Sequence, residues 1–357
     1  MAAMNSERVR FGLLLVCFFL SGFAALLYQT AWTREFSFVF GTSELAIAAV
    51  LAAYMAGLAL GAAVAGHLAA RIRRPVLAYG VLELLIALGA LAVPFGIQWV
   101  SRIYLSLLGG LEVPPESQGL AASLFHLAGT FIVLVPCTAL MGATLPLLAG
   151  HAVHREDQIG PRVGTLYAVN TAGAIAGTLC AAFVLLPELG LRKTVHVGVI
   201  GNGLVFVAAA LLAWGNAPGA AGADRSPSRF HWILLFMTLS GMVSFVYEVL
   251  WTRMLGHVLG GSTHAFSTML ASFLSGIALG SAVAARFAKT RQGAAIGFVV
   301  TQVATGVFAW LAFLAADQLP DFARMVGASV RNPTPGIALA AGYLLPFTLF
   351  IGATFPF

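Results

Sequence analysis

Residues 21–61, SGFAALLYQTAWTREFSFVFGTSELAIAAVLAAYMAGLALG, decide the fold, because the chain contains this stretch twice. Residues 240–280 read SGMVSFVYEVLWTRMLGHVLGGSTHAFSTMLASFLSGIALG and align with it without a gap. The offset is 219 residues, and 16 of the 41 aligned positions are identical. Self-similarity of this kind indicates a duplicated structural unit.

The residues that the two copies share are expected to serve the structure of the repeat. In lipid, burial of apolar surface does not drive helices together, so small residues four apart let two backbones approach closely. The side chains of the Trp-Thr-Arg block are suited to packing and to contact with the membrane surface. The positions interpreted in this way are Trp32, Arg34, Gly57 and Gly61 in the first copy and Trp251, Arg253, Gly276 and Gly280 in the second.

A second pair of blocks supports the duplication. Pro136–Pro146 read PCTALMGATLP, and Pro346–Pro356 read PFTLFIGATFP, at an offset of 210 residues. Both pairs occur in the same order along the chain. We therefore expect one ancestral unit that is present twice.

The composition indicates that lipid, not water, surrounds most of the chain. Of its 357 residues, 60% are hydrophobic and 9% are charged, whereas about 25% of the residues of an ordinary soluble domain are charged. The net charge of +6 lies in short segments between apolar runs, where it sets membrane orientation, so nucleic acid is not an expected partner. The three cysteines have unrelated spacings, and no Cys/His cluster has metal-ligand spacing, so neither a disulfide nor a metal site is expected.

Ten apolar runs are long enough to cross a bilayer, which takes about 20 residues of helix. They cover residues 11–31, 45–68, 76–100, 120–149, 163–187, 190–214, 231–251, 264–286, 293–316 and 336–357. Basic residues before the first run resemble the start of a signal peptide, but this run is long and belongs to the repeat, which favours an uncleaved helix. We predict a first six-helix repeat (1–214), a cytoplasmic linker (215–230) and a second repeat with four helices (231–357).

Lysine and arginine alternate between rich and poor sides of this topology. Twelve lie on the side of the N-terminus and seven on the other side, which places the N-terminus in the cytoplasm. An even number of helices per unit means that both copies enter the membrane in the same direction, as in the two halves of major-facilitator transporters. The predicted fold is an all-α polytopic membrane protein with a parallel, major-facilitator-like six-helix repeat whose second copy is incomplete. Because the sequence stops within the repeated Gly-Ala-Thr-x-Pro block, we expect it to belong to a longer protein.

Polar side chains at membrane depth are costly and are therefore functional candidates. Gln29 and Glu248 occupy the same position of the repeat, directly after Tyr28 and Tyr247. If the copies pack about a pseudo-two-fold axis, these side chains line a shared cavity, in which a carboxylate favours a cationic substrate or relays protons. The other candidates lie within apolar runs, namely Glu83, His126, Asn170 and Gln302.

Each candidate also has a structural interpretation. Tyr28 and Trp32 fall at the predicted outer end of the first run, where aromatic rings anchor helices at the membrane surface. Arg34 and Arg253 have side chains long enough to reach the lipid headgroups. The two intramembrane glutamates are equally suited to plain interhelical hydrogen bonds or ion pairs. Both interpretations stay open at this point.

Soluble-enzyme chemistry is missing from the sequence. Residues 198–203 read GVIGNG and superficially resemble a nucleotide-binding loop. They lie within an apolar run and lack the Gly-x-Gly-x-x-Gly spacing, so this interpretation is set aside. No Ser/His/Asp triad is indicated either, and no catalytic residue is predicted.

Four blocks carry a family resemblance. They are Ser-Gly-Phe-x-x-Leu-x-Tyr-x-x-x-Trp-x-Arg at 21–34, GLALG at 57–61, GATLP at 142–146 and GTLYAVNTAGA at 164–174. Together they resemble the membrane region of bacterial spermidine-synthase-like proteins, in which a major-facilitator-like membrane domain is fused to a spermidine synthase domain. In that family, the domain that uses decarboxylated S-adenosylmethionine follows the membrane part. Its cofactor loop and catalytic aspartate have no counterpart in residues 1–357, so neither a cofactor nor a catalytic residue is carried over.

The resemblance implies two functions. One is a transporter-like module for a polyamine or a related cation, next to a cytoplasmic aminopropyltransferase domain. The other is a structural membrane anchor for that enzyme. A stand-alone transporter of the major-facilitator type is disfavoured, because residues 67–75 lack the Gly-x-x-x-Asp-Arg-x-Gly-Arg pattern. The expected location is the bacterial inner membrane, and the expected partners are the bilayer, a small cation and a cytoplasmic enzyme domain.

Overall fold

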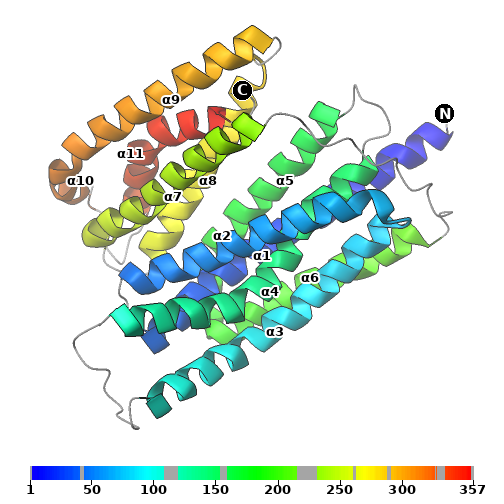
Figure 1. The fold of residues 1–357 in the computed structure, drawn as a ribbon, viewed down its shortest axis with the longest axis horizontal. Helices are drawn as coiled ribbons and strands as arrows, with labels where there is room; N and C mark the ends of the chain where they lie inside the picture. Colours follow the sequence, from blue (N-terminus) through cyan, green and yellow to red (C-terminus); the bar gives the residue numbers. More distant parts are fainter. Residues whose placement is uncertain are drawn as a thin grey trace. The chain divides into compact units, whose positions relative to one another are not determined.

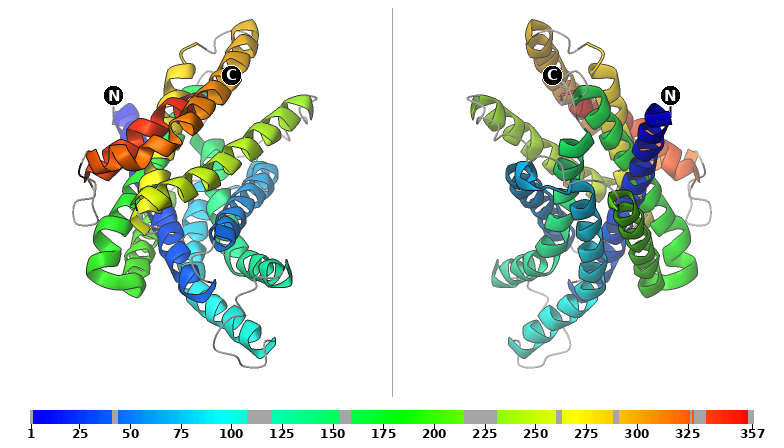
Figure 2. Two further views of the ribbon diagram at one scale, coloured as in Figure 1. Left: turned by 90° about the vertical axis from the view of Figure 1, so that its left-hand side faces the viewer. Right: turned by 90° about the vertical axis from the view of Figure 1, so that its right-hand side faces the viewer.

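The computed structural model describes residues 2–40, 44–107, 120–152, 159–214, 231–259, 263–287, 291–325, 327 and 334–354. Within these ranges the chain is helical and contains no strand, which confirms the all-α prediction (Figures 1 and 2). The chain divides into two compact units, residues 1–225 and 226–357, and each is described by itself. The predicted linker at 215–230 lies outside the described residues.

In the described part of unit 1, six long helices lie at the positions of the first six apolar runs (Figure 1). Their bounds are α1 Ala2–Phe40, α2 Glu44–Leu68, α3 Pro75–Leu107, α4 Leu120–Ala152, α5 Ile159–Cys180 and α6 Leu186–Ala213, with a 3-10 turn at Ala69–Arg71 and a π-helical turn at Ala181–Leu185. A helix satisfies its own backbone hydrogen bonds, which is why apolar sequence in lipid takes this form. Helix α6 packs against both α1 and α3, and this arrangement positions the site described below.

Unit 2 has four long helices and one short helix within its described residues. Their bounds are α7 His231–Leu259, α8 Thr263–Ala284, α9 Arg291–Leu314, α10 Leu319–Met325 and α11 Thr334–Ala353, with a 3-10 turn at Ala316–Gln318. The four long helices coincide with the last four predicted runs. The pair α8 and α11 makes the most extensive contact, and α9 also packs against α11.

Eight helical stretches in the described residues are long and apolar enough to cross a membrane. One of them, Gly164–Ala213, holds both the fifth and the sixth predicted runs, and the seventh predicted run, at 231–251, is not among the eight. The boundary between these two runs is Gly190, whose φ of 74° and ψ of 175° interrupt the helix. A positive φ is strained for residues with a Cβ, so glycine at this position permits the break between the two helical pieces.

Close helix crossings in unit 1 occur at the glycines of the repeat. A Cβ at Gly57 would lie 1.8 Å from Thr138 Oγ1, and a Cβ at Gly61 would lie 1.8 Å from the carbonyl oxygen of Ala139. Helices α2 and α4 therefore approach closely at these two points, as the spacing of small residues predicts. The backbone of α2 meets a side chain at Gly57 and the backbone of α4 at Gly61.

The same contacts recur in unit 2. A Cβ at Gly276 would lie 1.8 Å from Thr348 Oγ1, and a Cβ at Gly280 would lie 1.9 Å from the carbonyl oxygen of Leu349. The glycines are 219 positions and their partners 210 positions after those of unit 1, which are the offsets of the two repeated blocks. The crossing of α8 and α11 thus corresponds residue by residue to that of α2 and α4.

Candidate functional site

A buried carboxyl group joins three helices of unit 1. Glu83, on α3, has no exposed surface. Its Oε1 accepts a hydrogen bond from Ser21 Oγ on α1, at 2.5 Å, and its Oε2 accepts one from Asn202 Nδ2 on α6. Both donors are buried as well. Glu83 therefore connects α1, α3 and α6 through side chains alone.

Two tyrosines complete the group. Tyr28 donates a hydrogen bond to Asn202 Oδ1 at 2.7 Å, so the amide of Asn202 is held at both of its ends. The buried hydroxyl of Tyr79, one turn before Glu83, lies beside the carboxyl group but outside hydrogen-bond geometry. We call Ser21, Tyr28, Tyr79, Glu83 and Asn202 the Glu83 cluster.

Helical spacing and a missing side chain explain how the cluster assembles. Ser21 and Tyr28 lie seven residues apart on α1, a spacing that puts them on one face of the helix. On α6, a Cβ at Gly198 would lie 2.5 Å from Cε1 of the Tyr28 ring. Glycine at position 198 therefore makes room for that ring and lets the hydroxyl reach Asn202, which lies one turn further along α6.

The hydrogen-bond partners of Glu83 are neutral. A hydroxyl and an amide hold the two carboxyl oxygens, and neither supplies a positive charge. An ionised carboxylate without a counter-charge is expensive in a low-dielectric interior, and hydrogen bonds offset part of this cost. Carboxyl groups at membrane depth in such surroundings are characteristic of proton relays and cation pathways.

Three sequence candidates in unit 1 lie outside the Glu83 cluster. One of them, His126 on α4, is half-buried and packs against Tyr104, with ring centroids 4.7 Å apart. Gln29 is fully buried, and neither polar atom of its amide has a hydrogen-bond partner among the described residues. Asn170, on α5, is half-buried and donates a hydrogen bond to the carbonyl oxygen of Phe18 at 3.0 Å. Asn170 thus links α5 to the backbone of α1. Of the candidates in unit 1, the structure joins Glu83 and Tyr28 through Asn202.

Two of the candidates in unit 2 lie on α7, and a third, Gln302, lies on α9. Glu248 is buried, and its Oε1 has no hydrogen-bond partner within the described ranges. Tyr247 is half-buried and packs edge-on against Phe347, with ring centroids 5.8 Å apart. Because the two units are described separately, the predicted cavity shared by Gln29 and Glu248 stays a prediction.

The two tryptophans of the repeat lie inside their own units. Trp32 has no exposed surface and stacks on Tyr28, with ring centroids 5.3 Å apart. Trp251 is 5% exposed and contacts Phe347, with centroids 5.2 Å apart. Both rings therefore serve helix packing, and neither has the exposure of an aromatic anchor at the membrane surface. Of the two arginines, Arg34 is half-buried and Arg253 is exposed.

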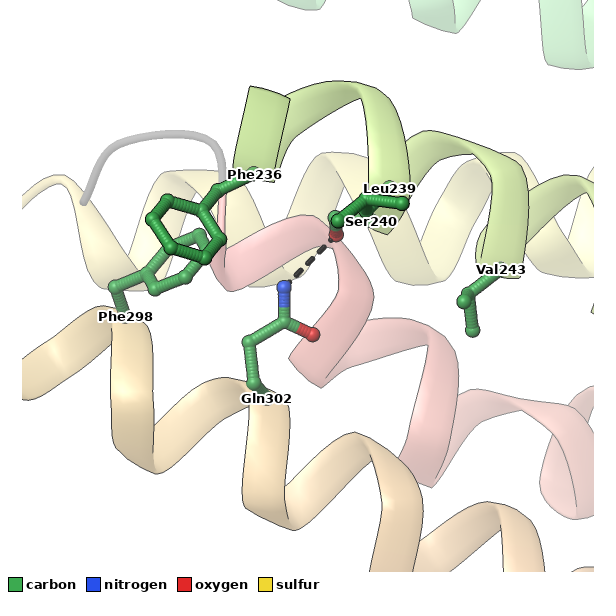
Figure 3. Close-up of a pocket in the computed structure, with 6 residues that line it drawn as sticks. All are labelled: Phe236, Leu239, Ser240, Val243, Phe298 and Gln302. Carbon is green, nitrogen blue, oxygen red and sulfur yellow. Dashed lines mark hydrogen bonds between the residues drawn. The ribbon is translucent and has the colours of Figure 1, made fainter. Parts of the chain in front are cut away.

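A pocket in unit 2 lies at positions that correspond to part of the Glu83 cluster (Figure 3). Gln302 Nε2 donates a hydrogen bond to Ser240 Oγ at 2.9 Å. These residues lie 219 positions after Glu83 and Ser21, so a hydroxyl–amide contact in unit 2 corresponds to the hydroxyl–carboxyl contact in unit 1. The pocket has a volume of about 260 Å³, and its remaining wall is apolar, formed by Phe236, Leu239, Val243 and Phe298.

Sequence reasoning did not select three members of the cluster. Asn202 lies in the GVIGNG segment, and an amide in an otherwise apolar run was the signal that could have identified it. Ser21 opens the repeated stretch and is identical in both copies. Tyr79 carried no signal of its own, because a tyrosine in an apolar run is common in a helix core.

Comparison with known proteins gives a distant relationship. No protein-family model matches the chain. The chain is 30% identical, over 190 residues, to Polyamine aminopropyltransferase 1 of Streptomyces coelicolor. The aligned part is 53% of this chain and 32% of the relative, so the chain spans about a third of the length of the curated relative. The structure therefore defines an all-helical protein with helices that could span a membrane, and the comparison adds a spermidine-synthase-like relation.

The hydrogen bond of Tyr28 leads to a first prediction. Tyr28→Phe removes the donor to Asn202 Oδ1 and keeps the stacked ring, so we expect a loss of about 0.5–1.5 kcal/mol of stability. The measurement is the free energy of unfolding in mixed micelles. Tyr247→Phe is the matched control, because Tyr247 has the same place in the repeat and contributes a ring contact to unit 2. Equal losses of unfolding free energy in Tyr28→Phe and Tyr247→Phe would contradict a stabilising role of the hydrogen bond between Tyr28 and Asn202.

Proposed function

We propose that this chain is the membrane domain of a polyamine-aminopropyltransferase-like protein and acts as a transporter-like module for a polyamine or a related cation. Its place is the bacterial inner membrane, with the N-terminus in the cytoplasm. The distant relative supports the polyamine link. The matching glycine crossings of α2/α4 and α8/α11 support two copies of one unit. The proposal arranges these copies in parallel, as in major-facilitator proteins.

The observation that carries this proposal is the Glu83 cluster. A fully buried carboxyl group sits where three helices meet, and its hydrogen bonds come from neutral side chains. In the proposed mechanism Glu83 takes up and releases the proton that couples cation movement to a change in helix packing. That change would break the hydrogen bonds that Ser21 and Asn202 donate to Glu83, because these bonds join α1 and α6 to α3.

A membrane anchor for an aminopropyltransferase domain is the second candidate. The observation that favours it is that both oxygens of Glu83 already accept hydrogen bonds from the protein. Under the anchor hypothesis, holding α1, α3 and α6 together is by itself enough to explain the presence of Glu83. In this case, an unrelated membrane anchor would restore full activity to the enzyme domain.

Uptake of radiolabelled spermidine into proteoliposomes separates the two functions. The transporter-like module predicts uptake above that of protein-free liposomes and an initial rate at least tenfold lower for Glu83→Gln, because an amide cannot release a proton. Glu188→Gln is the matched control, since it removes an exposed carboxylate at the start of α6. No uptake by the wild-type chain would favour the anchor. Uptake above background at equal rates for wild type and Glu83→Gln would refute the role of Glu83 in transport.

A further inference from the structure

At two pairs of equivalent positions, a carboxyl side chain in one unit corresponds to a carboxamide side chain in the other. Unit 1 has Gln29 and Glu83, and unit 2 has Glu248 and Gln302 at positions 219 residues later. Each unit therefore keeps one carboxyl group and one carboxamide, but on different helices. Each unit also keeps a hydrogen bond to the serine at the start of its repeated stretch. Ser21 bonds to the carboxyl group of Glu83, and Ser240 bonds to the carboxamide of Gln302.

This exchange leaves the acid of unit 2 in different surroundings from the acid of unit 1. Glu83 has a hydrogen bond on each oxygen, whereas Glu248 Oε1 is buried and has none among the described residues. Glu248 is 5% exposed, and its Oε1 is buried. Buried polar atoms are nearly always paired, and an exception calls for an occupant such as a ligand or an ordered water.

Two more partnerless groups accompany Glu248 in unit 2. The indole Nε1 of Trp251 and the hydroxyl of Ser267 are both buried without a hydrogen-bond partner within the described residues. Trp251 follows Glu248 by three residues on α7, so the two side chains are neighbours on one helix face. Glu248 and Trp251 thus form an unsatisfied polar pair within the packed helices.

The pair lies next to a group of aromatic rings. Trp251 contacts Tyr343 edge-on, with ring centroids 5.4 Å apart, and Phe347 at 5.2 Å. Phe347 also contacts Tyr247 and Phe273. Aromatic faces attract cations, most strongly at tryptophan, and they cover aliphatic carbon equally well.

We propose that Glu248 and Trp251 form a binding site for one alkylammonium group. The carboxylate Oε1 accepts a hydrogen bond from the ammonium group, and the rings of Trp251 and its neighbours cover the charge and the adjoining methylene groups. This assignment deepens the proposed function, on which the choice of a polyamine as ligand rests. Its site is distinct from the Glu83 cluster, which has no free carboxyl oxygen.

The residues present favour an organic cation over a metal ion. A bound metal needs several oxygen, nitrogen or sulfur ligands, and the described residues contain no group of three His, Cys, Asp or Glu side chains placed to share one. A single carboxylate beside aromatic rings is instead the arrangement that recognises ammonium groups.

Equilibrium binding of spermidine to the full chain in phosphatidylcholine nanodiscs tests this site. Zwitterionic lipid is used because anionic lipid would bind spermidine by itself. We expect Glu248→Gln to weaken binding at least tenfold and Glu188→Gln, which removes an exposed carboxylate, to leave it unchanged. Equal affinities for the wild type and Glu248→Gln would overturn the proposal, as would equal losses in both variants.

A second variant decides the outcome if Glu248→Gln does not fold. Trp251→Phe keeps an aromatic ring but weakens its attraction for a cation, so affinity should fall at least threefold. Unchanged affinity would refute the site. If spermidine binding depends on Glu248 but the chain shows no uptake, the binding site stands and the transport proposal fails. If the chain shows uptake but binding does not depend on Glu248, the transport proposal stands and the binding site fails.

Discussion

Replacement of Asn202 by leucine is expected to lower the free energy of unfolding of unit 1 by roughly 2–4 kcal/mol. The substitution removes the donor to Glu83 Oε2 and the acceptor for Tyr28 at the same time. Single hydrogen bonds between membrane helices contribute about 0.6 kcal/mol on average, because partners are also found in the unfolded state within the membrane. The expected loss is larger because it leaves a buried carboxyl oxygen and a buried hydroxyl unpaired, and a buried charged group that loses its partner costs more than a neutral one.

Asn170→Leu provides the matched control for this prediction. It makes the same chemical change on a helix of the same unit, but Asn170 contributes one hydrogen bond to a backbone carbonyl. We expect a loss of about 0.6 kcal/mol. The measurement for both is unfolding of the reconstituted chain in sodium dodecyl sulfate titrations. If Asn202→Leu costs no more than Asn170→Leu, the Glu83 cluster is not a cooperative unit and its place in the proposed mechanism is lost.

The helices of this chain could be predicted from the sequence because lipid allows few alternatives. In a bilayer an apolar run of sufficient length becomes a helix, since no other single segment satisfies its own backbone. The break between the fifth and sixth runs falls at Gly190, next to the predicted boundary. The short helix α10 was not predicted, because seven residues give too little periodic signal. The parallel, major-facilitator-like arrangement of the two copies stays a prediction.

The site was predictable in part. Glu83 and Tyr28 were identified because polar groups in apolar runs are costly, but their connection through Asn202 depends on how α1, α3 and α6 pack. That packing rests on contacts such as the one between Gly198 and Tyr28, which sequence spacing does not reveal. Glu83 and Gln302 are separated by the same 219 residues as the two copies of the repeat, but both lie outside the 41 aligned positions that define it. Weak similarity around these positions concealed their equivalence.

Replacement of Gly61 by alanine is expected to destabilise unit 1 by about 1–3 kcal/mol, since strain from overpacking is typically of this order. Two effects oppose each other at this position. Alanine is the better helix former by about 1 kcal/mol, but its Cβ would lie 1.8 Å from the carbonyl oxygen of Ala139. A backbone atom cannot rotate away as the end of a side chain can. Helices α2 and α4 must therefore separate, and the strain outweighs the gain in propensity.

Gly66→Ala, on the same helix, separates these two effects. A Cβ at Gly66 meets no atom within 4 Å, so only the propensity term remains, and we expect a change between zero and a gain of about 1 kcal/mol. The duplication extends the test to unit 2, where Gly280→Ala should be as damaging as Gly61→Ala because its Cβ would lie 1.9 Å from the Leu349 carbonyl oxygen. Thermal unfolding of all three variants in one detergent gives the comparison. A harmless Gly280→Ala beside a damaging Gly61→Ala would mean that the crossing of α8 and α11 does not have the role of its counterpart, and the structural support for equivalent crossings would be lost.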